Sequence, residues 1–229
     1  MNKKILIVAA HPDDEVLGCG GTILKHVADG DSVHIVIMAE GITSRDSVRD
    51  IVKNTSVLDK LHYQSHLVAK RLGAQSLTIF RFPDNRMDSV NLLDIIKKIE
   101  QVVDSIKPDV IYTHHGGDIN IDHQITNKAV ITASRALPGK SVKQILLFET
   151  LSSTDYQLID INNVFVPNWF VDIENEINNK IEILKIYDSE MRKYPHSRSY
   201  EGVKLLAQYR GLAVGHKYIE AFSLGRNIL

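Results

Sequence analysis

Short apolar runs rich in β-branched residues alternate along this chain with segments whose apolar residues recur at helical spacing. The runs predict five strands, at residues 5–9, 33–38, 77–82, 110–113 and 145–148. The segments between them predict four helices, at residues 17–28, 57–72, 92–106 and about 124–136. Such alternation favours right-handed βαβ units in a three-layer α/β/α fold, with a mostly parallel sheet covered on both faces. The wholly apolar runs at 5–9 and 110–113 indicate central strands.

Beyond residue 150 this alternation weakens. We expect an extra strand over 165–173, a long amphipathic helix over 174–192 and a C-terminal helix over 200–213. No linker, repeat or low-complexity tract interrupts the 229 residues, so the sequence predicts a single domain over 1–229.

Charge and cysteine content narrow the classes of function. The formal net charge is −1 and the basic residues are spread along the chain, which argues against a nucleic-acid partner. The single cysteine, Cys19, rules out an internal disulfide and is expected to be a small buried side chain. The apolar start is too short for a signal peptide, and no stretch reaches the roughly 20 apolar residues that span a bilayer. The sequence therefore predicts a cytoplasmic protein without a membrane span.

Polar residues follow the first predicted strand directly, in the order His11, Pro12, Asp13, Asp14, Glu15. In open α/β sheets the carboxyl edge of the strands holds the ligand crevice. A helix N-terminus begins at the same place and favours negative charge there. Helix capping is the alternative interpretation, but it accounts for only one of the three acidic residues.

A second polar segment follows the fourth predicted strand and ends in Asn120, Ile121, Asp122 and His123. If the sheet has a Rossmann-like order, the first and fourth strands are neighbours and their loops open onto one crevice. We then expect His11, Asp14 and His123 to meet. Two imidazoles and one carboxylate are the ligands of a catalytic zinc site with an open fourth position. Asp13 is left to act as a general base.

These motifs closely resemble those of the PIG-L/LmbE-like deacetylases. The resemblance rests on AHPDDE at 10–15, PDNRMD at 83–88, NIDH at 120–123 and the segment from 210 to 222. It implies an LmbE-like fold, with His11, Asp14 and His123 as ligands of Zn²⁺, or of another divalent metal such as Fe²⁺, and with Asp13 as general base. It also implies hydrolysis of the N-acetyl group of a small amino sugar or its conjugate and, by analogy, a homo-oligomer.

The sequence departs from the family pattern at Asn120, where many members carry a histidine that is thought to stabilise the oxyanion. Asn120 can donate a neutral hydrogen bond to an oxyanion but cannot supply a proton or a positive charge. His114 or His115 compensates, or both are packing residues at a strand end. Asp122 is expected to orient the site rather than to bind the metal.

A family arginine is missing as well, because ungapped counting puts Leu61 in its place. Arg45, in the loop after the second strand, is the best substitute for binding substrate. Asp84 and Arg86 follow the third strand at the same edge and are expected to contact the sugar, although a simple turn is the alternative there. His196 lies in a segment, 194–199, that is a lid, a binding site for an anionic part of the substrate, or an exposed loop.

Three other functions were weighed against the deacetylase. A thiol-conjugate amidase would use the same zinc site, and a non-catalytic metal- or sugar-binding protein would keep the fold without turnover. A dinucleotide-binding oxidoreductase is disfavoured because no GxGxxG follows the first strand and two aspartates would repel a pyrophosphate.

Overall fold

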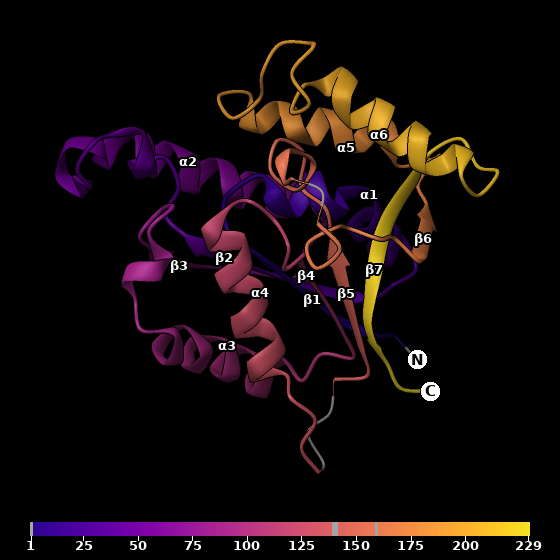
Figure 1. Ribbon diagram of the computed structural model, residues 1–229, viewed down its shortest axis with the longest axis horizontal. Coiled ribbons are helices and arrows are strands. Elements are labelled where there is room, and N and C mark those ends of the chain that lie inside the picture. Colours follow the sequence, from indigo (N-terminus) through magenta and orange to yellow (C-terminus); the bar gives the residue numbers. More distant parts are fainter. Residues whose placement is uncertain (1, 139–141, 159) are drawn as a thin grey trace.

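The computed structural model describes residues 2–138, 142–158 and 160–229, which form a seven-stranded sheet with helices on both faces (Figure 1). The strands are β1 (Lys4–Ala9), β2 (Ser32–Ala39), β3 (Ser76–Phe82), β4 (Val110–His114), β5 (Gln144–Phe148), β6 (Trp169–Asp172) and β7 (Ile219–Asn227). The helices are α1 (Asp14–Ala28), α2 (Ile51–Leu72), α3 (Leu92–Ile106), α4 (Ile121–Ala133), α5 (Ile177–Leu184) and α6 (Tyr200–Leu212). In these ranges no helix is both long and apolar enough to cross a bilayer.

The strand order is β3-β2-β1-β4-β5-β7-β6, with the first five strands of the chain parallel to one another. Ile5 pairs with Val33 on one side and with Val110 on the other, so β1 is central and β4 is its neighbour. This order confirms the mostly parallel Rossmann-like α/β fold. The connections from β1 and β4 leave in opposite directions, which opens a crevice at the carboxyl edge between them.

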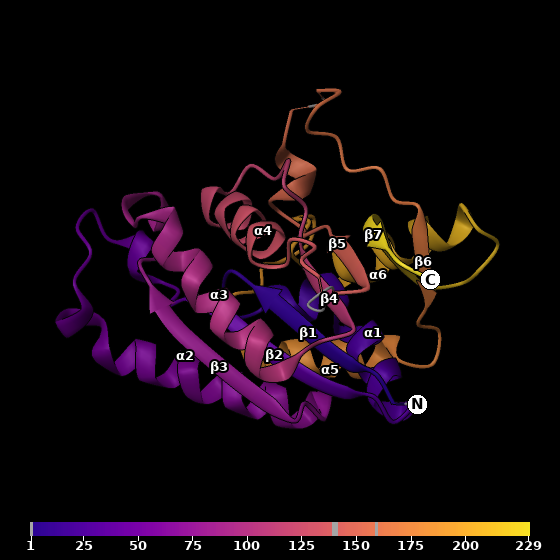
Figure 2. The ribbon, with the colours of Figure 1, turned by 90° about the horizontal axis from the view of Figure 1, so that it is seen from below.

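The apolar strands are buried from both sides because helices cover both faces of the sheet. Ile5 and Ile7 pack in the core that includes α1, α2, α5 and α6, whereas Leu6 and Val8 pack in the core with α3 and α4. Figure 2 shows α3 and α4 on one face and α1, α2 and α5 on the other. Alternate side chains of a strand point to opposite faces, so a continuous apolar run satisfies both cores.

Three helices, α1, α2 and α4, begin earlier than their apolar spacing indicates, and side-chain caps extend the last two. The side chain of Asp50 accepts the Lys53 amide at the start of α2, and that of Asn120 accepts the Asp122 amide at the start of α4. The second cap matters for the site, since it puts Asp122 and His123 in the first turn of α4.

The C-terminal third differs most from the sequence prediction. The strand expected over 165–173 is limited to β6, and the helix expected over 174–192 is wrong beyond Leu184. A 3-10 turn, Lys185–Tyr187, follows α5 and points the Tyr187 hydroxyl at Glu15, 2.9 Å away. β7 was not predicted. It lies antiparallel between β5 and β6, and its first four residues are all buried, so it lacks the alternating pattern of a half-buried strand.

Candidate functional site

The loops after β1 and β4 meet at the carboxyl edge of the sheet, where they bring His11, Asp14 and His123 together. Asp14 Oδ2 lies 3.2 Å from His11 Nδ1 and 3.2 Å from His123 Nε2. One ligand atom from each of the three side chains lies within 4.8 Å of the others. The sheet order places these residues in one cluster although His11 and His123 are far apart in the sequence.

Two buried atoms of this cluster lack a hydrogen bond: Asp14 Oδ1 and His123 Nε2. Buried polar atoms are rarely left in this state unless a ligand, ion or water satisfies them. Burial alone would raise the pKa of Asp14, but the His123 charge and the hydrogen bond with His11 hold it well below its usual range, so its carboxylate is anionic. An anionic carboxylate and two imidazoles make a donor set that fits a divalent transition metal.

In each imidazole of the cluster, the nitrogen that does not face Asp14 lies next to another carboxylate. His11 Nε2 lies 3.0 Å from Asp122 Oδ2, and His123 Nδ1 lies 3.1 Å from Asp118 Oδ2. Metal-binding histidines in proteins almost always have such a partner, which fixes the ring orientation and the tautomer. Asp84 also approaches His11 Nε2, at 3.3 Å, and with Asp122 it forms a second group of possible metal donors around this ring.

Asp13 has an unusual backbone conformation that separates it from Asp14. It occupies the N-cap position of α1 with φ 108°, in the region that non-glycine residues avoid, and its side chain makes no capping hydrogen bond. The side chain of Asp13 therefore does not cap α1. Its amide instead donates to Glu15 Oε2 at 3.0 Å.

The Asp13 carboxyl group is buried and contacts Arg198. Arg198 Nη1 donates to Asp13 Oδ2 at 3.0 Å, while Oδ1 makes no hydrogen bond. Burial raises the pKa of Asp13 to about 7, although the Arg198 charge opposes this shift. A carboxyl group with a pKa near neutrality can both accept and return a proton at neutral pH.

His114 is part of the wall of the cluster. Its Nε2 accepts the Ala10 amide at 2.9 Å, and its ring stacks on His123 with the centroids 3.9 Å apart. Burial, together with the His123 charge, lowers its pKa well below the ordinary value, so the ring is neutral. His114 thus supports the cluster as an uncharged packing group.

Asn120 and Asp122 begin α4 and are held by different contacts. The Oδ1 atom of Asn120 accepts the Asp122 amide at 2.9 Å, which leaves only the Nδ2 group to donate to a ligand. Asp122 accepts the Asn85 amide at 2.6 Å and the Met87 amide at 3.0 Å, in addition to its contact with His11. Asp122 therefore ties the loop after β3 to His11.

Of the residues expected to bind substrate, Asp84 contacts the cluster, whereas Arg45 and Arg86 contact other loop residues. Asp84 is buried against His11, and one of its oxygens accepts the Ser44 amide at 2.9 Å. Arg45 is half-exposed and pairs with Glu190 at 2.5 Å. Arg86 donates to the carbonyls of residues 46 and 47, at 3.3 and 3.4 Å.

His115 and His196, the two histidines expected to bind substrate, contact loops. His115 Nε2 lies 2.9 Å from the Asn163 carbonyl, and its ring packs on Phe165, so its partners lie in the loop after β5. His196 Nδ1 accepts the Arg198 amide at 3.1 Å, which puts it beside the partner of Asp13.

Sequence reasoning missed Asp118 and Arg198 as residues of the site. Asp118 lies within the polar segment after the fourth strand, and the need of a metal-binding histidine for a carboxylate partner could have singled it out. Arg198 lies in the 194–199 segment that the sequence did draw attention to, but nothing local links it to Asp13, 185 residues away.

The protein has a Rossmann-like α/β sheet, and the His–Asp–His cluster lies at the carboxyl edge of its strands. The Asp13 carboxyl group lies beside this cluster. These features define the class of protein: an α/β protein with a candidate metal site. The chain belongs to the PIG-L family, whose model, described as GlcNAc-PI de-N-acetylase, matches residues 6–134. The match confirms the resemblance seen in the motifs.

Known relatives extend over most of the chain. The chain is 31% identical over 156 residues to the uncharacterized deacetylase YaiS of Escherichia coli, covering 66% of this chain and 76% of that protein. It is 23% identical over 226 residues to diacetylchitobiose deacetylase of Thermococcus kodakarensis, covering 95% of this chain and 81% of that protein.

A solved structure of a protein named for a different activity shares the fold. The 4-carboxy-2-hydroxymuconate hydratase GalB of Pseudomonas putida superposes with a TM-score of 0.78 at 20% identity, over 99% of this chain and 98% of that one. The fold is therefore common to more than one chemistry, and the function has to be argued from the site.

Proposed function

We propose that this protein is a metal-dependent hydrolase that removes the N-acetyl group from an amino sugar or its conjugate. The observation that carries the proposal is the convergence of His11, Asp14 and His123 next to the buried carboxyl group of Asp13. Membership of the PIG-L family and deacetylases among the relatives support the same reaction.

In this proposal His11, Asp14 and His123 hold a zinc ion, and the hydrogen-bond-free atoms Asp14 Oδ1 and His123 Nε2 support that assignment. Fe²⁺ suits the same donor set. A bound ion of this kind would supply Lewis acidity, which activates water and polarises a carbonyl group. Asp118 and Asp122 orient the two imidazoles.

Asp13 is the proposed general base and, later, the general acid. Its carboxylate takes a proton from water and returns it to the nitrogen of the departing amine. Arg198 holds one oxygen of Asp13 and leaves the other, Oδ1, without a hydrogen bond and free to accept that proton. Burial excludes bulk water from this carboxyl group and raises its pKa into the range that the two proton transfers need.

The substrate-facing roles are assigned from position. The Nδ2 group of Asn120, the only donor of this side chain, donates to the developing oxyanion, while Oδ1 accepts the helix-cap bond. Arg45, Asp84, Arg86, His115 and His196 are the proposed contacts to the sugar or its substituent. Asp84 and His196 have the strongest support, because Asp84 touches His11 and His196 is bonded to Arg198. We propose a small N-acetyl sugar substrate and a cytoplasmic setting.

The proposal is tested with a panel of N-acetylated amino sugars and their glycoside, nucleotide and disaccharide derivatives, with detection of free amine. The zinc-loaded protein is expected to release acetate and amine from at least one member. Chelation should abolish this release, and added zinc should restore it. Binding of zinc without amine release from any member would contradict the proposal and favour a non-catalytic binding protein.

A further inference from the structure

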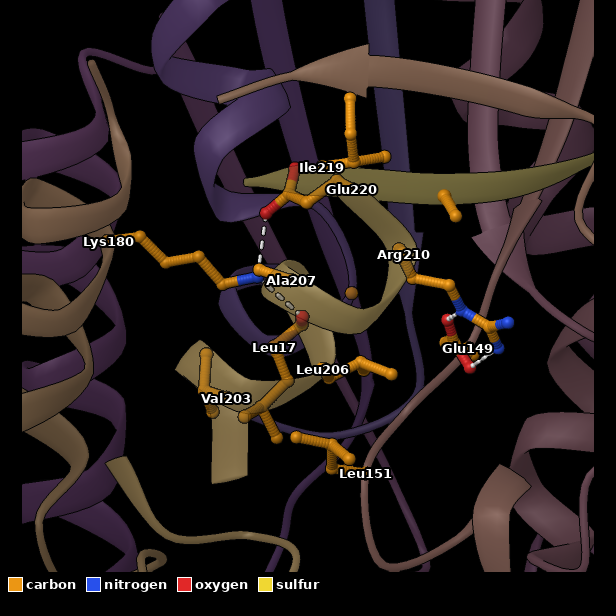
Figure 3. A pocket seen from close by; sticks show the side chains of 12 residues that line it. Leu17, Glu149, Leu151, Lys180, Val203, Leu206, Ala207, Arg210, Ile219 and Glu220 are labelled. Carbon is orange, nitrogen blue, oxygen red and sulfur yellow. Dashed lines mark hydrogen bonds and ion pairs between the residues drawn. The ribbon is translucent and has the colours of Figure 1, made fainter. Parts of the chain in front are cut away.

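Helix α1, which begins next to the metal cluster, is broken at Cys19, where φ is −150° and ψ is 24°. In an unbroken helix the Gly21 amide would donate to the Leu17 carbonyl. Here the Gly21 amide donates to Glu220 Oε1 at 2.8 Å, and the Leu17 carbonyl accepts from Lys180 Nζ at 2.8 Å. Figure 3 shows Lys180 and Glu220 reaching this point from α5 and β7.

The two side chains form an ion pair of 2.6 Å inside the gap, and Glu220 Oε2 also accepts the Thr22 amide at 2.6 Å. Both side chains are 4% exposed. A buried ion pair is costly to desolvate unless further hydrogen bonds satisfy it. Here the Gly21 amide bonds to Glu220 and the Leu17 carbonyl bonds to Lys180. The ion pair thus takes the place of the backbone hydrogen bond that the break removes.

Glycines allow α1 to pack closely on both sides of the break at Cys19. A Cβ atom on Gly18 would come within 2.3 Å of the Phe148 ring, and one on Gly21 within 2.8 Å of Ile173. The break and these close contacts together fix the direction of the first turn separately from the rest of the helix.

We propose that Lys180 and Glu220 form a positioning pair for the metal cluster. By holding the break in α1, they fix the direction of the turn that carries Asp13 and Asp14. The inference rests on the proposed metal site. Both residues lie outside residues 6–134, so they belong to the part of the chain that the family model does not match.

The pocket next to this pair, about 20 Å³ in volume, is large enough for one water molecule and too small for a sugar. The pair therefore acts through α1 and not by touching substrate. Arg210 and Glu149 line the same pocket and form a bidentate pair, at 2.8 and 2.6 Å, which involves no atom of α1 (Figure 3). That second pair provides a matched control.

The test compares Glu220→Gln with Glu149→Gln, each of which removes one charge of an ion pair on this pocket. Glu220→Gln is expected to raise the zinc Kd about tenfold and to lower kcat about tenfold, with KM nearly unchanged, as for groups that orient metal ligands. Glu149→Gln should leave both constants within about twofold, because the pair of Glu149 with Arg210 makes no bond to α1. Zinc affinity and kcat equal to the parent in a folded Glu220→Gln variant would overturn the inference.

Two further measurements keep the test decisive. If Glu220→Gln does not fold, Lys180→Met retains the side-chain length and the bonds from Glu220 to α1. It should weaken zinc binding in the same direction, and an unchanged Kd would overturn the inference. In zinc-free protein, the NMR signals of the His11 and His123 rings should shift in Glu220→Gln and not in Glu149→Gln. This readout does not depend on activity, so it separates failure of the positioning pair from failure of the proposed function.

Discussion

Residues 4–134 and residues 142–227 contribute to the same site in different ways. The first region forms the parallel strands β1 to β4 and supplies His11, Asp14, His123 and Asp13. The second region supplies groups that hold them from outside. Arg198 contacts Asp13, Tyr187 contacts Glu15, Ser153 and Thr154 contact Asp118, and Lys180 and Glu220 contact α1.

The first region therefore provides the reactive groups, and the second region helps to hold them in place. The proposed ligands follow two adjacent parallel strands, so the topology alone brings them together. Asp118 and Asp122 orient the two imidazoles from within the first region, and the region that follows β5, which has no βα repeat, adds contacts to Asp13, Asp118 and α1. If this division is right, changes in the first region should abolish metal binding or chemistry, and changes in the second should weaken them by degrees.

The largest effect is expected for His123→Ala in the first region. Loss of one of three proposed ligands should abolish zinc binding at micromolar concentration and with it all amine release, because the remaining two side chains cannot hold the ion alone. Isothermal titration with zinc and the amine assay measure the two losses. Stoichiometric zinc binding by a folded His123→Ala variant would contradict the assignment of His123 as a zinc ligand.

The next effect is expected for Asp13→Asn, which keeps the size of the side chain but cannot take up a proton. Zinc should still bind, whereas kcat should fall about 10²- to 10⁴-fold, as for loss of a general base. Equal loss of zinc in Asp13→Asn and His123→Ala would contradict the separate roles of ligand and base.

A smaller effect is expected for Arg198→Gln in the second region. It removes the charge-assisted hydrogen bond to Asp13 at 3.0 Å while the proposed ligands stay in place. We expect about a tenfold fall in kcat, the size of one such bond, with zinc affinity unchanged. Arg192→Gln is the matched control, since Arg192 lies just before the 194–199 segment and bonds to backbone carbonyls. Equal effects of both variants would show that the segment acts as a whole and not through Asp13.

The sequence was sufficient for the parts of the site that follow from local order. His11 and Asp14 come directly after an apolar strand, and His123 comes shortly after another, so the parallel order predicted their meeting. The outcome for Asp13 was partly predictable. Its position next to the cluster was expected, but its positive φ and its burial against Arg198 were not.

The remaining contacts could not be predicted because they join residues that are remote in sequence and carry no local pattern. Arg198 meets Asp13 across 185 residues, and Glu220 meets Gly21 across 199. Glu220 also lies within a run of buried residues in β7, a strand that was not predicted. Its reason to be there is the break in α1, which apolar spacing does not reveal.

The central claim is that one cation binds between His11, Asp14 and His123. Anomalous diffraction at the zinc edge, on crystals grown with one equivalent of zinc, tests it most directly. The account predicts one strong peak within coordination distance of all three side chains, about 2.0–2.2 Å from each ligand atom. A peak among His11, Asp84 and Asp122 instead, with none beside His123, would contradict it.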